Sequence, residues 1–71
     1  MILTQLKSND IAKIISVDGG HMYQQKLSLR GIAEGNIVRV ISNLGPVTIE
    51  VDRNIVSIGR GMAHKIHVLK V

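Results

Sequence analysis

Residues 47–58 read VTIEVDRNIVSI and combine the period-two alternation of a half-buried β-strand with a turn and a second apolar run. Val47, Ile49 and Val51 are predicted to face a core, and Thr48 and Glu50 to face solvent. The polar residues 52–54 are typical of a hairpin turn, and residues 55–58 are predicted to return as the next strand. The segment therefore predicts an antiparallel β-hairpin.

Three other apolar runs, at residues 11–17, 37–42 and 66–71, are predicted to be strands. Glycine-containing segments at residues 18–20, 34–36 and 44–46 separate them from their neighbours and indicate turns or loops. In the first run, Ile11, Ile15 and Val17 share one face of the strand, while Ala12 and Ile14 share the other.

A helix is predicted from about residue 21 to residue 30, with Tyr23 and Leu27 on one face. Gly31 suits the left-handed residue that follows a helix end, and Ile32 would then contact Leu27 in a Schellman ending. Residues 59–64 are predicted to form a tight turn or one helical turn. Near the N-terminus, Leu3 and Leu6 are expected to cover one end of the core.

The composition favours a small β-protein. The 71 residues allow one domain, spanning residues 1–71, and they include 11 Ile and 8 Val but no Phe, Trp or Cys. Five short strands with one short helix after the first predict a mainly β fold, a small antiparallel barrel of the SH3-like kind. The chain shows no basic leader and no run of about 20 apolar residues, so we expect a cytoplasmic protein.

No constellation of catalytic residues is visible, so we expect neither an enzyme nor a cofactor. The acidic residues are scattered and are expected to be solvated; they are Asp10, Asp18, Glu34, Glu50 and Asp52. His21 is expected in a solvated loop. His64 and His67 could bind a metal from one helical face, but the helical turn is expected to end between them, so no metal site is predicted. A ferrous-iron carrier that uses these two histidines remains a minor hypothesis.

Nucleic-acid binding is the main alternative from the residues alone, because the net charge is +4 and small barrels often bind nucleic acids. Tyr23 is the only aromatic side chain that could stack on a base. The side chains that could contact phosphates are Lys26, Arg30, Arg53, Arg60 and Lys65. Such binding would be weak and sensitive to salt, and it is not expected.

The predicted helix carries one apolar residue too many for a single buried face. Leu27 and Leu29 lie about 200° apart on the helix, so they cannot both face one core. If Leu27 is buried, Leu29 points outward near Met22, and an exposed apolar patch indicates a partner surface. The predicted partner-binding residues are Met22, Tyr23, Lys26, Leu29 and Arg30.

The order of these signals resembles the ferrous-iron transport protein A family (FeoA). The matching features are Leu3 and Leu6, Val17 before Gly19-Gly20, Lys26-Leu27, Gly31-Ile32, Gly35, Gly45-Pro46, Ile49 and Val51, the run from Ile58 to Ala63, and Ile66 and Val68. They extend over nearly the whole chain. Each is weak by itself, and the ordered set is more specific than its parts.

The resemblance implies an SH3-like barrel that acts as a non-catalytic cytosolic accessory protein of ferrous iron uptake. Its implied partner is a FeoB-type transporter, contacted at the cytosolic GTP-binding domain or at the membrane part. A related domain occurs at the end of some metal-dependent repressors, where it serves protein contact, so an interaction domain of a metal-dependent regulator is a further alternative.

Overall fold

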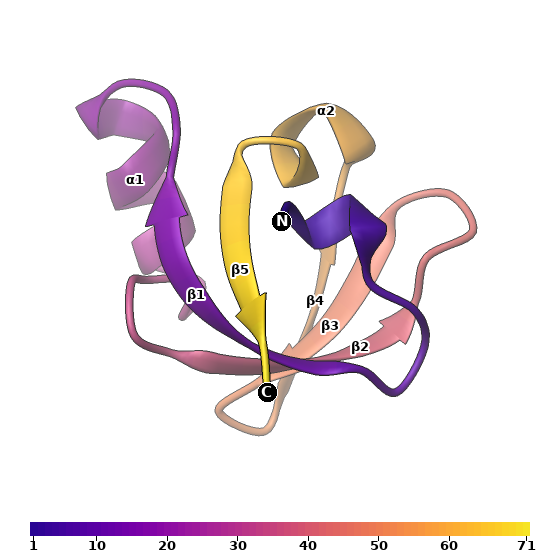
Figure 1. The fold of residues 1–71 in the computed structure, drawn as a ribbon. Helices are drawn as coiled ribbons and strands as arrows, with labels where there is room; N and C mark the ends of the chain where they lie inside the picture. Colours follow the sequence, from indigo (N-terminus) through magenta and orange to yellow (C-terminus); the bar gives the residue numbers. More distant parts are fainter.

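The structure, a computed structural model, describes residues 1–71 and consists of five strands, two α-helices and one 3-10 turn (Figure 1). In chain order the elements are η1 (Leu3–Gln5), β1 (Ile11–Val17), α1 (His21–Ser28), β2 (Ile37–Ser42), β3 (Val47–Val51), β4 (Asn54–Ile58), α2 (Arg60–Ala63) and β5 (Ile66–Lys70). The predicted strands are confirmed, most of them to the residue, because each has an apolar run bounded by turn residues. Neither helix has the length and apolar character needed to span a bilayer.

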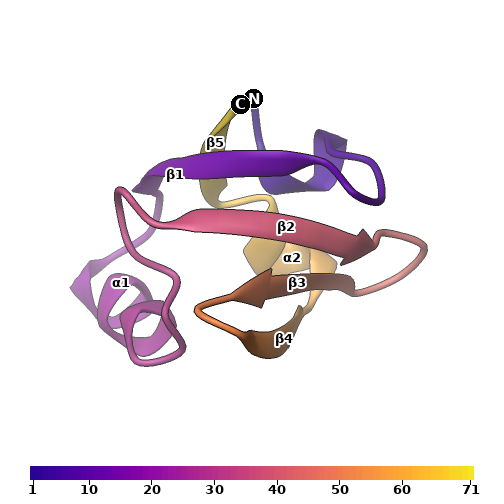
Figure 2. The same cartoon turned by 90° about the horizontal axis from the view of Figure 1, so that it is seen from below.

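All strand pairs are antiparallel, and the sheet order is β4-β3-β2-β1-β5. The sheet curls so that its edge strands β4 and β5 are connected by α2 at one end of the barrel (Figures 1 and 2). The β5 edge is partly covered by the N-terminal segment, because Val68 donates its backbone N–H to the carbonyl of Met1 at 2.8 Å. This architecture confirms the predicted five-stranded, SH3-like barrel with a short helix after the first strand.

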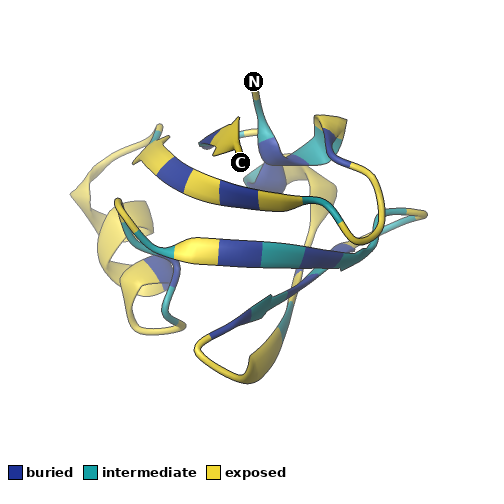
Figure 3. Ribbon diagram, turned by 60° about the horizontal axis from the view of Figure 1, so that its bottom comes forward, coloured by how far each residue is buried: buried dark blue, intermediate teal, exposed yellow.

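The core contains only apolar side chains. Fifteen residues are buried, and none of them is polar or charged. They include Leu27, Ile49 and Ile66, and also Leu3 and Leu6, which close one end as predicted. Figure 3 shows buried positions alternating with exposed or half-buried ones along β1 and β2, as a sheet with one face on the core requires.

Strand β1 does not keep the predicted faces along its whole length, because Val17, predicted to share a face with Ile11 and Ile15, packs partly buried against the core. Ala12 and Ile14 are buried, while Ile11 and Ile15 remain 43% and 42% exposed on the outer face of the sheet. A β-bulge between Ile14 and Ser16 interrupts the pairing with β5 and leaves Ile15 as the extra residue. The sequence showed two apolar faces on this strand, and only the curl of the sheet determines which one points inward.

The hairpin turn between β3 and β4 is one residue shorter than predicted. Val51 pairs with Asn54, so the turn consists of Asp52 and Arg53, whose φ angles are +50° and +67°. Positive φ at both central residues is typical of a type I′ turn, in which glycine is favoured at the second position. Arg53 is therefore held in a backbone conformation that side-chain-bearing residues rarely adopt.

Candidate partner-binding site

The C-terminal end of α1 is fixed by a Schellman motif. The N–H of Ile32 donates to the carbonyl of Leu27, and the N–H of Gly31 donates to that of Ser28, both at 3.0 Å. Gly31 has a φ of +84°, which glycine adopts without steric cost. Leu27 and Ile32 are both buried, so the predicted ending is confirmed and it sets the rotation of α1 about its own axis.

The N-terminal end of α1 is held by contacts with Lys65, just before β5, and with the end of β1 and the loop that follows it. The Tyr23 ring lies under the ammonium of Lys65, which is 5.3 Å from the ring centroid. Gly19, with a φ of +102°, allows this ring to come close, since a Cβ there would lie 2.9 Å from a Tyr23 ring carbon. The side-chain amide of Gln24 also donates to the carbonyl of Val17 at 3.2 Å.

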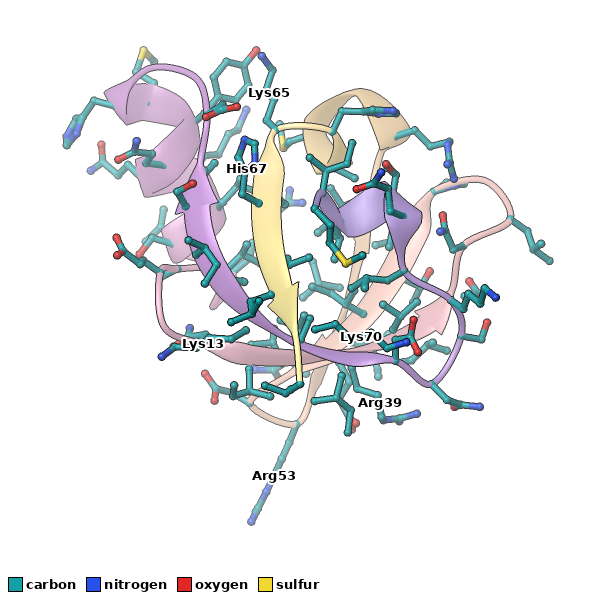
Figure 4. The ribbon with its side chains drawn as sticks, in the orientation of Figure 1. Lys13, Arg39, Arg53, Lys65, His67 and Lys70 are labelled. Atoms are coloured by element: carbon teal, nitrogen blue, oxygen red, sulfur yellow. The ribbon has the colours of Figure 1, made fainter.

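A second link joins the β1–α1 connection to β5. The ring nitrogen Nε2 of His67 lies 2.6 Å from Asp18 Oδ2, and the backbone N–H of Asp18 donates to the carbonyl of Lys65 at 2.7 Å. Figure 4 shows Lys65 and His67 at the end of β5 that lies toward α1. Both ends of α1 are therefore attached to the barrel, although only Leu27 of its residues is buried.

The outer side of α1, together with its C-cap residue Leu29, carries two of the most exposed apolar side chains of the chain. Met22 and Leu29 are 82% and 85% exposed, and their spacing of seven residues places them on one stripe of the helix. A shallow groove of about 520 Å³ lies over this stripe and is lined by Met22, Tyr23, Gln25, Lys26 and Leu29. The structure thus brings together four of the five predicted partner-binding residues.

The fifth predicted residue, Arg30, is exposed just beyond α1 and does not line the groove. Gln25 lines the groove and was missed, because glutamine on a helix surface carries no signal beyond polarity. The sequence suggests Lys65 only as a phosphate contact. Its position over Tyr23 depends on a pairing of distant segments that the sequence does not reveal.

The groove is bordered by positive charge. No Asp or Glu occurs from residue 19 to residue 33, and the structure forms no salt bridge with Lys26 or Arg30. The nearest acidic residue on the N-terminal side, Asp18, is bound by His67. The surface of α1 is therefore both apolar and cationic.

The histidines do not join in one site. His64 follows α2, and its Nδ1 lies 2.6 Å from the carbonyl of Arg60, while His67 on β5 contacts Asp18. His21 is the first residue of α1 rather than part of a loop, because the helix starts directly after Gly20. No group of three or more His, Asp or Glu side chains is arranged to hold a metal ion.

The expectation that all five acidic residues are simply solvated is wrong for three of them. Glu50 pairs with Arg39 at 3.0 Å, Asp18 with His67, and Asp10 lies 3.4 Å from the ammonium of Lys70. These pairs join strands or loops that are distant in sequence. The backbone N–H of Lys7 donates to Asp10 at 2.8 Å and, with the nearby Lys70, lowers the pKa of Asp10 from its ordinary value of 3.8.

The fold and this surface define the class of the protein: a small SH3-like β-barrel with a short helix whose outer side is apolar and cationic. The FeoA domain family matches residues 1–70. The chain therefore belongs to the FeoA family, whose members are accessory proteins of ferrous iron transport with no known catalytic activity.

Solved structures agree with this assignment. The crystal structure of an iron uptake regulatory protein (FeoA) is 30% identical, with a TM-score of 0.93, and the match covers 100% of this chain and 96% of that one. FeoA of Stenotrophomonas maltophilia, an SH3 domain protein complexed with zinc, is 21% identical over 97% of this chain and 89% of that chain, with a TM-score of 0.83.

The fold also occurs within larger regulators. T. acidophilum IdeR is 22% identical, with a TM-score of 0.92, over 100% of this chain but only 34% of the regulator. At that identity the likeness concerns the fold alone. A search of curated protein sequences gives no match to this chain.

Proposed function

We propose that this chain, as a single domain, is a non-catalytic cytosolic accessory protein that binds the cytosolic part of a FeoB-type ferrous iron transporter. The proposed contact residues are Met22, Tyr23, Lys26, Leu29 and Arg30. The observation that carries the proposal is the exposure of Met22 and Leu29 on one stripe of α1, in a chain that belongs to a ferrous iron transport family.

Exposure of these side chains is difficult to explain by folding. Leu29 contributes almost nothing to the core at 85% exposure, and a polar residue there would avoid apolar contact with water. Interfaces have an apolar centre and a polar, solvent-accessible rim, and Leu29 with Lys26 and Arg30 beside it is compatible with that arrangement. Support for a binding role therefore comes from the surface, and support for iron transport comes from the family.

The test is calorimetric titration of this protein with the purified cytosolic GTP-binding domain of the transporter from the same organism. We expect saturable binding, and repeating the titration with GTP and GDP analogues would reveal whether nucleotide state alters it. No heat and no co-elution would contradict binding to that domain and would redirect the search to the membrane part.

The contact surface is tested separately by Leu29→Glu, which should weaken binding by tenfold or more, a loss of about 1.4 kcal/mol. Leu44→Glu is a matched control, because Leu44 is 100% exposed in the β2–β3 loop and lies on a different part of the barrel. Equal binding by both variants, with intact circular dichroism spectra, would refute the assignment of the site to α1.

A further inference from the structure

We infer that the groove on α1 receives an acidic amphipathic helix, which places one aliphatic side chain between Met22 and Leu29 and its carboxylates against Lys26 and Arg30. The inference rests on the proposed function, because it concerns the same surface. It adds the chemistry of the segment that binds there.

The apolar part of the argument comes from the spacing of the two exposed side chains. Met22 and Leu29 are two helical turns apart, about 10 Å along the axis. The groove between them is lined by Gln25 and Lys26, whose flexible stems can move aside from an entering side chain. A facing helix presents side chains at one-turn intervals, so a single Leu or Ile can lie between Met22 and Leu29.

The charged part of the argument comes from Lys26 and Arg30. They are four residues apart, so they lie along one side of the apolar stripe, and neither forms a salt bridge in this chain. Carboxylates spaced by one turn on a facing helix match that separation. No acidic residue lies between residues 19 and 33, and the Asp52 carboxylate, which the fold brings beside Gly31, lies past the end of α1 and does not line the groove. The groove lining itself therefore holds no negative charge that would repel those carboxylates.

Two other occupants fit this surface less well, one because of its charge and one because of its shape. A second copy of this chain, docked helix to helix, would bring Lys26 and Arg30 against cations of its own kind. An anionic bilayer would satisfy the charges. However, α1 has only eight residues and presents a groove, whereas helices that lie in a membrane surface bury a broad apolar face.

The groove is also preorganised. Burial of Leu27, the Schellman ending at Gly31, and the Tyr23–Lys65 contact fix the rotation and both ends of α1 before any partner arrives. Binding to a fixed surface loses less conformational entropy than binding to a mobile one. A short segment can therefore bind measurably without the rest of its protein.

The test uses a designed helical peptide of about three turns, with Leu on one stripe and Glu on both flanks, and a twin in which every Glu is Lys. Amide chemical shifts of the isotope-labelled protein are followed during titration with each peptide. We expect the Glu peptide to shift amides between residues 21 and 32, and the Lys peptide to leave them unchanged. No shifts with the Glu peptide, or equal shifts with both, would overturn the inference.

Variants of this protein test the apolar contacts and the charged contacts of the groove separately. Leu29→Glu and the pair Lys26→Glu with Arg30→Glu should each weaken peptide binding by about tenfold or more. Lys7→Glu with Lys13→Glu is the matched charge control, because both lysines are exposed, form no salt bridge and lie outside α1. Equal loss in the control pair would mean that only net charge matters, which would overturn the inference.

Lys26 and Arg30 also lie near the C-terminal end of α1, where cations favour the helix dipole, so the melting temperature of each variant is measured in parallel. The remaining part of the experiment measures binding of the protein to vesicles of phosphatidylglycerol with phosphatidylcholine. Binding to these vesicles that is lost in Leu29→Glu, without any response to the Glu peptide, would assign the groove to a membrane and overturn the inference.

The outcomes separate this inference from the proposed function. A response to the Glu peptide without binding to the transporter domain would support the groove chemistry while removing that domain as partner. Transporter binding that Leu29→Glu does not weaken, without a response to the Glu peptide, would support the function and overturn the inference.

Discussion

Strand β3 and helix α1 differ in how much of their sequence is determined by the core. In β3, Val47, Ile49 and Val51 are buried and alternate with residues that are half-buried. In α1, only Leu27 of eight residues is buried, and the others face solvent. The strand is specified by packing, whereas most of the helix is free of packing demands, so its exposed apolar residues require another explanation.

The contrast is sharpest between two leucines. Leu27 is 1% exposed and Leu29 is 85% exposed, although one residue separates them. The helix directs them to opposite sides. Identical side chains therefore lie in opposite environments, and if Leu29 binds a partner as proposed, substitutions at the two positions should have separable effects on stability and on binding.

The largest effect is expected from Leu27→Ala, which should lower the free energy of unfolding by about 2–5 kcal/mol because it leaves a cavity under the Schellman motif. Leu29→Ala should change it by less than about 0.5 kcal/mol. Urea denaturation measures both. A mild effect at Leu27, or a large one at Leu29, would contradict the contrast.

A smaller decrease in the free energy of unfolding is expected from Gly31→Val, because a β-branched residue is strained at a φ of +84°. The added Cβ itself would find ordinary contacts, 3.5 Å from Val51 at the closest, so the backbone causes the loss. We expect urea denaturation to show a decrease of about 1–3 kcal/mol in the free energy of unfolding. Gly31→Asn is the control, since asparagine tolerates this conformation better and should cost less.

A gain in stability is expected from Arg53→Gly. Arg53 lies at a φ of +67° in the β3–β4 turn, and glycine relieves the strain by about 1 kcal/mol. Arg53→Ala keeps the strain and should give no such gain, which makes it the control in thermal unfolding. Equal melting temperatures for the Gly and Ala variants would show that the turn is not strained. Arg53 points away from the barrel in Figure 4.

The smallest effect concerns pH and lies outside the contrast between helix and strand. The pKa of Asp10 is lowered in the folded state, mainly by the N–H of Lys7, so its contribution to stability is present above pH 3.8 and is lost as the pH falls through the lower folded-state pKa. The stability difference between wild type and Asp10→Asn should be constant at neutral pH and shrink below about pH 4. A difference unchanged down to about pH 2 would exclude this role.

The FeoA-like fold could be predicted in most respects from the sequence. The strand bounds followed from apolar runs and turn residues, and the Schellman ending of α1 followed from Leu27, Gly31 and Ile32. Four of the five predicted partner-binding residues share a groove because their positions on a helix follow from its geometry. These features depend on neighbours within a few residues, which a sequence displays directly.

Contacts between distant segments were not predictable. Asp18 meets His67, 49 residues away, and Tyr23 meets Lys65 because the curl of the sheet brings β5 beside the start of α1. Exposed polar side chains carry no periodic signal, so many pairings are equally compatible with the sequence.

The sequence by itself determined which residues form strands and where α1 ends, because backbone preferences and hydrophobic periodicity act locally. Only the tertiary structure decided that Ala12 and Ile14 rather than Ile11 and Ile15 enter the core, since both faces of β1 are apolar. It likewise decided which charges surround the groove on α1. The physical reason is the same in each case: burial depends on where the other elements pack, and that information is spread over the whole chain.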